Sequence, residues 1–114
     1  MDIQVTKDSA ILFSYIYKEY LRRKKKGISY AKSINFNVLY DFDDGPCAKM
    51  NQREILHCAD ELQRAGLVRS YAVDFSLTGD GITYAERRGL KDEDIQKWID
   101  RLISAVSAVV PLLP

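Results

Sequence analysis

Residues 51–81, NQREILHCADELQRAGLVRSYAVDFSLTGDG, contain several local structural signals in succession. Asn51 with Glu54 three residues later is a close variant of the capping box that starts a helix. Gly66 supplies the left-handed residue that ends a helix. We therefore expect a helix from Asn51 to Ala65, with a narrow apolar stripe on its inner face.

The segment after this glycine is rich in β-forming residues. Apolar side chains from Leu67 to Leu77 predict two short strands, with the reversal near Ala72 to Asp74. Thr78 then has the side chain of an N-cap for a helix over residues 79–88, which Gly89 closes. The sequence therefore predicts a tight hairpin that leads directly into a helix.

Before residue 51, the sequence gives a clear secondary-structure prediction only in the first half of the segment. Apolar spacing predicts a helix over residues 8–26, ended by Gly27. The segment that follows suggests a short strand at Ile28 to Ala31, a short helix near Phe36 to Phe42, and a turn at residues 43–46.

The C-terminal part predicts a long apolar helix. Asp92, Glu93 and Asp94 suit the positive end of the helix dipole, and Pro111 stops the helix after about Val110. We assign residues 1–91 to one domain and residues 92–114 to a dimerisation or docking element of that domain.

Composition limits the function classes. The 114 residues suit a single domain, and 46% of them are hydrophobic. Seventeen Lys and Arg against sixteen Asp and Glu give a charge of +1, so any nucleic-acid binding must come from local charge placement. Charged residues interrupt the apolar start of the chain, which favours a cytoplasmic protein over a secreted one.

Residues 62–68, LQRAGLV, and 75–81, FSLTGDG, resemble the winged helix-turn-helix pattern of a helix ending L-x-x-x-G-L-V, a two-stranded wing and L-T-x-x-G. The Trp in a long last helix is similar to small PadR-type and MarR-type bacterial regulators, whose terminal helices build a dimer. The resemblance implies a mostly α fold with a small β-hairpin wing (α+β), extended by a long C-terminal helix.

The resemblance also implies that helix 51–65 enters the major groove of DNA. Projection places Arg53, His57 and Arg64 on its outward face, and Gln52 adds donors for base edges or phosphates. The competing interpretation is a solvated face on which Asp60 pairs with Arg64.

Acidic side chains count against DNA binding. Asp60 and Glu61 would repel phosphate, and Asp74 stands where the family usually has a basic wing tip. A second group of candidate DNA-binding residues lies at the end of the first predicted helix and comprises Arg22, Arg23, Lys24, Lys25 and Lys26. These residues are interpreted either as a patch that contacts phosphate or as a solvated helix end.

The last helix carries more apolar surface than a small domain is expected to cover. Leu102 to Pro114 contains no charged residue, but these thirteen residues fall short of the roughly twenty that cross a membrane. We therefore expect a homodimer, with membrane contact as a weaker alternative. The predicted interface consists of Phe13, Tyr17, Trp98, Ile99, Leu102, Ile103, Val106, Val109 and Val110.

The sequence gives little support for catalysis or metal binding. His57 is the only histidine, so a nucleophile, a base and an orienting acid cannot be assembled by spacing. The acidic stretch around residue 43 lacks the spacing of a calcium loop. Cys58 is expected to be a buried apolar side chain and Cys47, beside Pro46, an exposed thiol. We predict no cofactor, no metal site and no enzyme activity.

The function expected from these features is that of a small dimeric DNA-binding protein that regulates transcription. The alternative is a protein-interaction module that keeps the winged-helix frame without DNA binding. Such a module docks its apolar C-terminal helix against another protein or a membrane.

Overall fold

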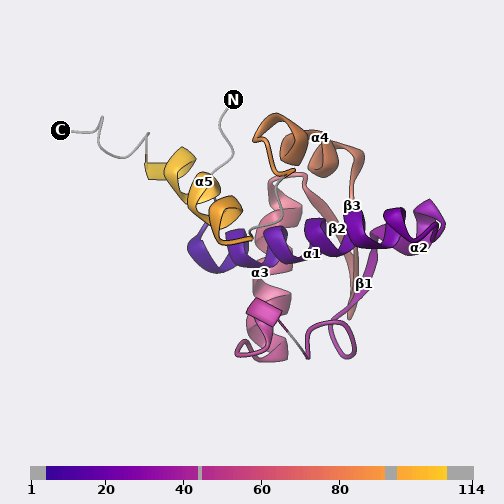
Figure 1. The fold of residues 1–114 in the computed structure, drawn as a ribbon. Coiled ribbons are helices and arrows are strands. Elements are labelled where there is room, and N and C mark those ends of the chain that lie inside the picture. Colours follow the sequence, from indigo (N-terminus) through magenta and orange to yellow (C-terminus); the bar gives the residue numbers. More distant parts are fainter. Residues whose placement is uncertain (1–4, 44, 92–94, 108–114) are drawn as a thin grey trace.

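The computed structural model describes residues 5–43, 45–91 and 95–107 (Figure 1). Helices predominate, and three short strands form one antiparallel sheet, so the chain is a mostly helical α+β domain. In chain order the elements are α1 (Lys7–Lys25), α2 (Tyr30–Ile34), β1 (Asn35–Asn37), the 3-10 turn η1 (Gly45–Cys47), α3 (Gln52–Arg64), β2 (Val68–Tyr71), β3 (Asp74–Leu77), α4 (Gly79–Arg87) and α5 (Ile95–Ser107).

α1 is the helix around which the others pack. It contacts α2, η1, α3 and α5, and Figure 1 shows it running across the molecule with α5 near one end and α2 near the other. Thr6 caps its start, because the hydroxyl accepts a hydrogen bond from the Ser9 N–H. Gly27, at φ 82°, ends it as predicted. Leu12 and Ile16 on α1 are completely buried.

The predicted start, end and buried face of α3 are confirmed. The Asn51 side chain accepts a hydrogen bond from the Glu54 N–H at 2.8 Å, and the Glu54 carboxylate accepts one from the Asn51 N–H at 3.0 Å. Gly66 ends the helix at φ 81°. Ile55 and Leu62 face the core, which confirms the predicted inner stripe.

The segment between α1 and α3 differs from the prediction. Residues 30–34 form a helix capped by Ser29, and residues 35–37 form a strand, so the predicted strand at Ile28 to Ala31 and the helix near Phe36 to Phe42 are wrong. The reason is tertiary: Phe36 lies opposite Phe75 in the sheet, and their rings stack with centroids 6.0 Å apart.

The sheet has the order β1-β3-β2, so β1 lies beside the predicted hairpin. Tyr71 pairs with Asp74 across a two-residue loop in which Ala72 has φ 52°, which confirms the predicted reversal. One edge is closed by α3, because the Gln63 amide oxygen accepts a hydrogen bond from the Ser70 N–H at 2.5 Å.

α5 corrects the prediction for the C-terminal helix. It is short, with 13 residues from Ile95 to Ser107, whereas a long helix from residue 92 to about Val110 was expected. Residues 92–94 and 108–114 lie outside the described residues. No helix in the described part of the chain is long and apolar enough to cross a membrane.

The predicted dimer stays a prediction, but the argument for its interface does not hold for five of the nine predicted residues. Five of its members are already buried within the single chain, where α1 packs against α5 and the rings of Tyr17 and Trp98 lie 5.8 Å apart; they are Phe13, Tyr17, Trp98, Ile99 and Leu102. These side chains need no second copy to cover them. The side chains of Ile103 and Val106, and residues Val109 and Val110, lie outside the described residues.

α4 packs against the backbone of Leu67 because residue 81 has no side chain. A Cβ on Gly81 would lie 3.0 Å from the carbonyl carbon of Leu67 and closer still to its oxygen. The Thr78 hydroxyl fixes the approach, since it accepts a hydrogen bond from the Gly81 N–H at 2.9 Å and donates one to the Gly66 carbonyl at 2.6 Å.

We predict that Gly81→Ala destabilises the domain, because the added methyl group forces α4 away from Leu67. Overpacking of this kind costs about 1–3 kcal/mol, measurable as a lower free energy of unfolding in urea. Gly79→Ala is the matched control, because nothing lies within 4 Å of a Cβ at that position. Equal losses in the two variants would contradict this account of the packing.

Candidate nucleic-acid interface

The four residues of α3 that are predicted to contact DNA are all at the surface. Gln52, Arg53 and His57 are exposed, and the Arg64 side chain is 80% exposed. The exposure of Arg53, His57 and Arg64 agrees with the outward face that projection predicted, and Gln52 is exposed in the first turn of the helix. Their binding role stays a prediction.

The acidic residues of α3 have partners within the protein. Glu54 belongs to the capping box, and the Glu61 carboxylate accepts a hydrogen bond from the Thr6 N–H at 2.9 Å. Asp60 forms an ion pair with Arg64, with 2.9 Å between nitrogen and oxygen. The C-terminal half of α3 therefore uses its charges locally, whereas its N-terminal half presents Gln52 and Arg53.

The basic residues at the end of α1 differ in their surroundings. Arg22 pairs with Glu19 through hydrogen bonds that hold the pKa of that carboxyl below its ordinary value, against the opposing effect of desolvation. Arg23 is only 14% exposed, and its guanidinium donates to the carbonyls of Lys32 at 3.1 Å and Asn35 at 2.7 Å. Arg23 also covers the Phe36 ring at 4.5 Å.

Arg23 is thus a structural residue. Its hydrogen bonds join α1 to the end of α2 and to the edge of β1, and it also pairs with Glu19. Three neighbours are exposed cations, namely Lys24, Lys25 and Lys26. Of these, the Lys24 ammonium lies 5.8 Å from the Tyr30 ring centroid.

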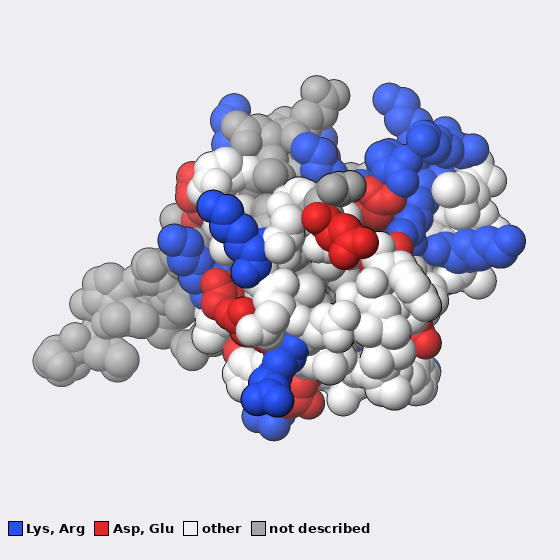
Figure 2. Space-filling view, turned by 90° about the horizontal axis from the view of Figure 1, so that it is seen from below, with Lys and Arg blue, Asp and Glu red and all other residues white. Residues whose placement is uncertain are grey.

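The exposed cations do not merge into one basic surface on the face shown in Figure 2. Blue side chains gather at the upper right, where α1 ends, and red and white groups lie between them and the blue groups at the left and bottom. The basic end of α1 is therefore a patch of its own on this face.

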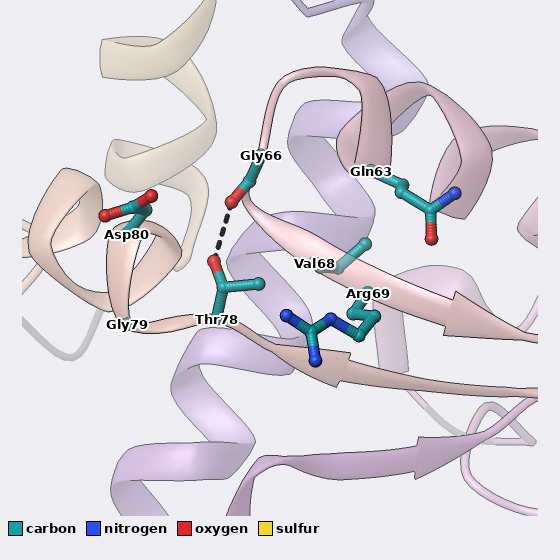
Figure 3. Close-up of a pocket in the computed structure, with 7 residues that line it drawn as sticks. All are labelled: Gln63, Gly66, Val68, Arg69, Thr78, Gly79 and Asp80. Carbon is teal, nitrogen blue, oxygen red and sulfur yellow. Dashed lines mark hydrogen bonds between the residues drawn. The ribbon is translucent and has the colours of Figure 1, made fainter.

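An open hollow of about 540 Å³ lies between the end of α3 and the start of α4; it is lined by Gln63, Gly66, Val68, Arg69, Thr78, Gly79 and Asp80. Figure 3 shows the hydrogen bond from Thr78 to Gly66 between these elements, with Arg69 on one side and Asp80 on the other. Arg69 is an exposed cation that sequence reasoning missed, although its place in the predicted wing was a usable signal.

The acidic residue of the β2–β3 hairpin has a structural role. Asp74 accepts a hydrogen bond from the Asn37 side-chain amide at 2.8 Å and so joins β3 to β1. Two other exposed side chains near this end of the sheet are apolar or aromatic: Tyr40 is 74% exposed and Tyr71 is 56% exposed.

The cysteines are both buried and free. This confirms the prediction for Cys58 and overturns it for Cys47, which lies in the core where η1 packs against α1. Burial raises the pKa of the Cys47 thiol to about 12, so it remains protonated at neutral pH. Within the described ranges, no cluster of three or more potential metal ligands is present.

Comparisons with known proteins add no further constraint. No family model, curated protein or solved structure matches this chain. The candidate interface therefore rests on its own residues.

We predict that Arg23→Ala lowers the free energy of unfolding by about 1–3 kcal/mol, because it leaves the carbonyls of Lys32 and Asn35 without their donor. Thermal or urea unfolding measures the change. Arg22→Ala, one residue earlier and half exposed, is the control and should change stability much less. The opposite order of the two effects would show that Arg23 is not structural.

Proposed function

We propose that this chain is a winged-helix DNA-binding protein in which α3 enters the major groove. Two features of the fold support the assignment: α3 leads directly into the hairpin of β2 and β3, and β1 completes a sheet of order β1-β3-β2. One feature departs from the pattern, because a 3-10 turn and not a full helix precedes α3.

The observation that carries the proposal is the N-terminal half of α3. Gln52 and Arg53 are exposed, and neither side chain has a hydrogen bond or ion pair with another residue in the described part of the chain. His57 follows one turn later and is exposed as well. Recognition helices contact base edges mainly with their N-terminal residues, so the position of these donors supports readout by α3.

The residue types suit defined contacts. Arg53 can donate two hydrogen bonds to guanine, and Gln52 can donate and accept with adenine. Arg64 remains with Asp60 at the far end of the helix. We assign Lys24, Lys25 and Lys26 a long-range role, because a separate positive patch attracts a polyanion without a contact in the final complex.

Control of transcription belongs to the same proposal. A regulator of this class acts as a homodimer that places two recognition helices in successive major grooves, about 34 Å apart. The dimer contact must involve residues other than those buried between α1 and α5.

A second function is favoured by a separate observation. Exposed aromatic side chains at the end of the sheet are typical of protein-interaction surfaces. The alternative of a protein-interaction module therefore stands, with docking at this end of the sheet. Trp98, Ile99 and Leu102 of α5 are buried and do not provide the docking surface.

We predict that Arg53→Ala weakens binding to duplex DNA by about 1–3 kcal/mol, the value of a bidentate base contact. Fluorescence anisotropy with a duplex library selected on the parent protein measures the loss. Lys97→Ala, which removes one exposed positive charge from α5, is the matched control and should bind like the parent. No binding by the parent, or equal losses in both variants, would refute the proposal.

Replacement of Lys24, Lys25 and Lys26 by glutamine tests the long-range role. We expect a lower association rate at low salt, converging with the parent rate as salt screens the patch, and an unchanged dissociation rate. Stopped-flow measurements over a salt series separate the two rates. A faster dissociation of the triple variant would instead place these lysines in contact with phosphate.

A further inference from the structure

The end of α1 and the helix α2 form a strongly basic part of the surface. Residues 20–40 contain six basic side chains and no acidic one. Two of the six, Arg22 and Arg23, are paired with Glu19. The other four are exposed, and together with the exposed side chain of Tyr30 we call them the basic corner; they are Lys24, Lys25, Lys26 and Lys32.

The lysines of the basic corner have no acidic partners. No carboxylate in the described part of the chain forms an ion pair with any of the four. Figure 2 shows blue side chains gathered where α1 ends. Like charges held together repel one another, and a bound polyanion removes that repulsion. The charge of the basic corner therefore favours a polyanionic ligand.

The basic corner is carried by a fixed turn between the two helices. Gly27, at φ 82°, ends α1, and the Ile28 N–H donates to the Arg23 carbonyl at 3.0 Å. The Arg23 guanidinium donates to the Lys32 carbonyl at 3.1 Å. The Ser33 hydroxyl donates to the Ile28 carbonyl at 3.1 Å. These bonds tie α2 to α1, which lowers the entropic cost of binding one ligand across both helices.

Tyr30 adds an aromatic surface to these charges. It is 48% exposed, and it is the one large hydrophobic residue that is exposed among the described residues of α1 and α2. The buried Tyr20 supports it, with ring centroids 6.5 Å apart and ring planes at 89°. The Lys24 ammonium lies 5.8 Å from the Tyr30 ring centroid, close to the outer limit of a cation–π contact, so a flat ligand can take its place.

We propose that the basic corner binds single-stranded nucleic acid, with the lysines on phosphates and the Tyr30 ring stacked on one base. Proteins that bind single strands combine a positively charged surface with aromatic side chains on which bases stack. In a duplex the faces of each base are covered by its neighbours, whereas an unpaired base is free to stack on a side chain. An aromatic ring among unpaired lysines therefore favours a single strand over a duplex.

An anionic lipid surface fits the basic corner less well. Lipid headgroups attract lysines by charge alone, and helices that lie on a membrane also insert several large apolar side chains. Among the described residues of α1 and α2, Tyr30 is the one exposed side chain of that size. The aromatic ring is accounted for by a base and not by a headgroup.

Fluorescence anisotropy with labelled oligothymidine of about 12 nucleotides tests the proposal. Oligothymidine forms no duplex, so the outcome is independent of major-groove binding by α3. Tyr30→Leu keeps an apolar contact with Tyr20 but removes the ring, and it should weaken binding at least about fivefold, the effect of losing one base stack. Tyr30→Phe keeps the ring and should bind like the parent.

Salt dependence separates the phosphate contacts from the stacking contact. Replacement of Lys24, Lys25 and Lys26 by glutamine should reduce the slope of log affinity against log salt by about 2, because each phosphate contact on a single strand contributes about 0.7. Tyr30→Leu should leave this slope unchanged, because it removes no charge.

Tyr71→Leu is the matched control, because Tyr71 is also exposed, at 56%, but lies on β2, at the opposite edge of the sheet from β1. It should bind oligothymidine like the parent, and circular dichroism verifies that all variants fold. A parent chain that does not bind oligothymidine overturns the proposal. So does a loss in Tyr71→Leu equal to that in Tyr30→Leu, or a salt slope that the triple lysine variant leaves unchanged. Tighter binding to phosphatidylserine vesicles than to oligothymidine, with no effect of Tyr30→Leu on either, would identify a lipid surface instead.

Discussion

The backbone of Leu67 is the point on which the arrangement of α3, the sheet and α4 depends. Its N–H donates to the Leu62 carbonyl at 3.0 Å and so completes the end of α3, while its carbonyl accepts from the Thr78 N–H at 3.1 Å and closes the hairpin. Gly81 lets α4 approach the same peptide. The end of α3, the closure of the hairpin and the position of α4 thus all depend on Leu67. This shared contact fixes the outward face of α3 relative to the sheet.

The second constraint is electrostatic and lies at the far end of α1. Five consecutive basic residues suggest a single patch, yet Arg23 points inward and bonds to the edge of β1. Arginine suits this position because its planar fork can serve two carbonyls and a carboxylate while covering an aromatic ring. Arg23 therefore holds the sheet, whereas the lysines of the same basic segment face solvent. Only these exposed lysines can act on a ligand.

Sequence signals were reliable where the cause of structure is local. The capping box at Asn51, the stop at Gly66 and the cap at Thr78 each depend on residues within a few positions, and each is confirmed. β1 could not be predicted in this way, because Phe36 is in a strand only through its pairing with Phe75, 39 positions away. The burial of Trp98 by α1 depends on distant packing in the same way. The outward face of α3 followed from helix periodicity, but Asp60, Glu61 and Arg23 show that partners, not residue types, decide which charges are free.

These constraints place two distinct kinds of surface on one small domain. The N-terminal half of α3 offers hydrogen-bond donors whose neighbouring acids are occupied by a cap, an ion pair and the start of α1. The end of the sheet exposes Tyr40 and Tyr71; beside them Asp41 pairs with Arg23, and Asp74 accepts a hydrogen bond from the Asn37 amide. In both places the carboxylates have partners within the protein, but only Asp60 and Asp41 are paired with a cation, so the other carboxylates keep their negative charge. Because the two surfaces use different residues, a contact at the end of the sheet leaves Gln52 and Arg53 available to a polyanion.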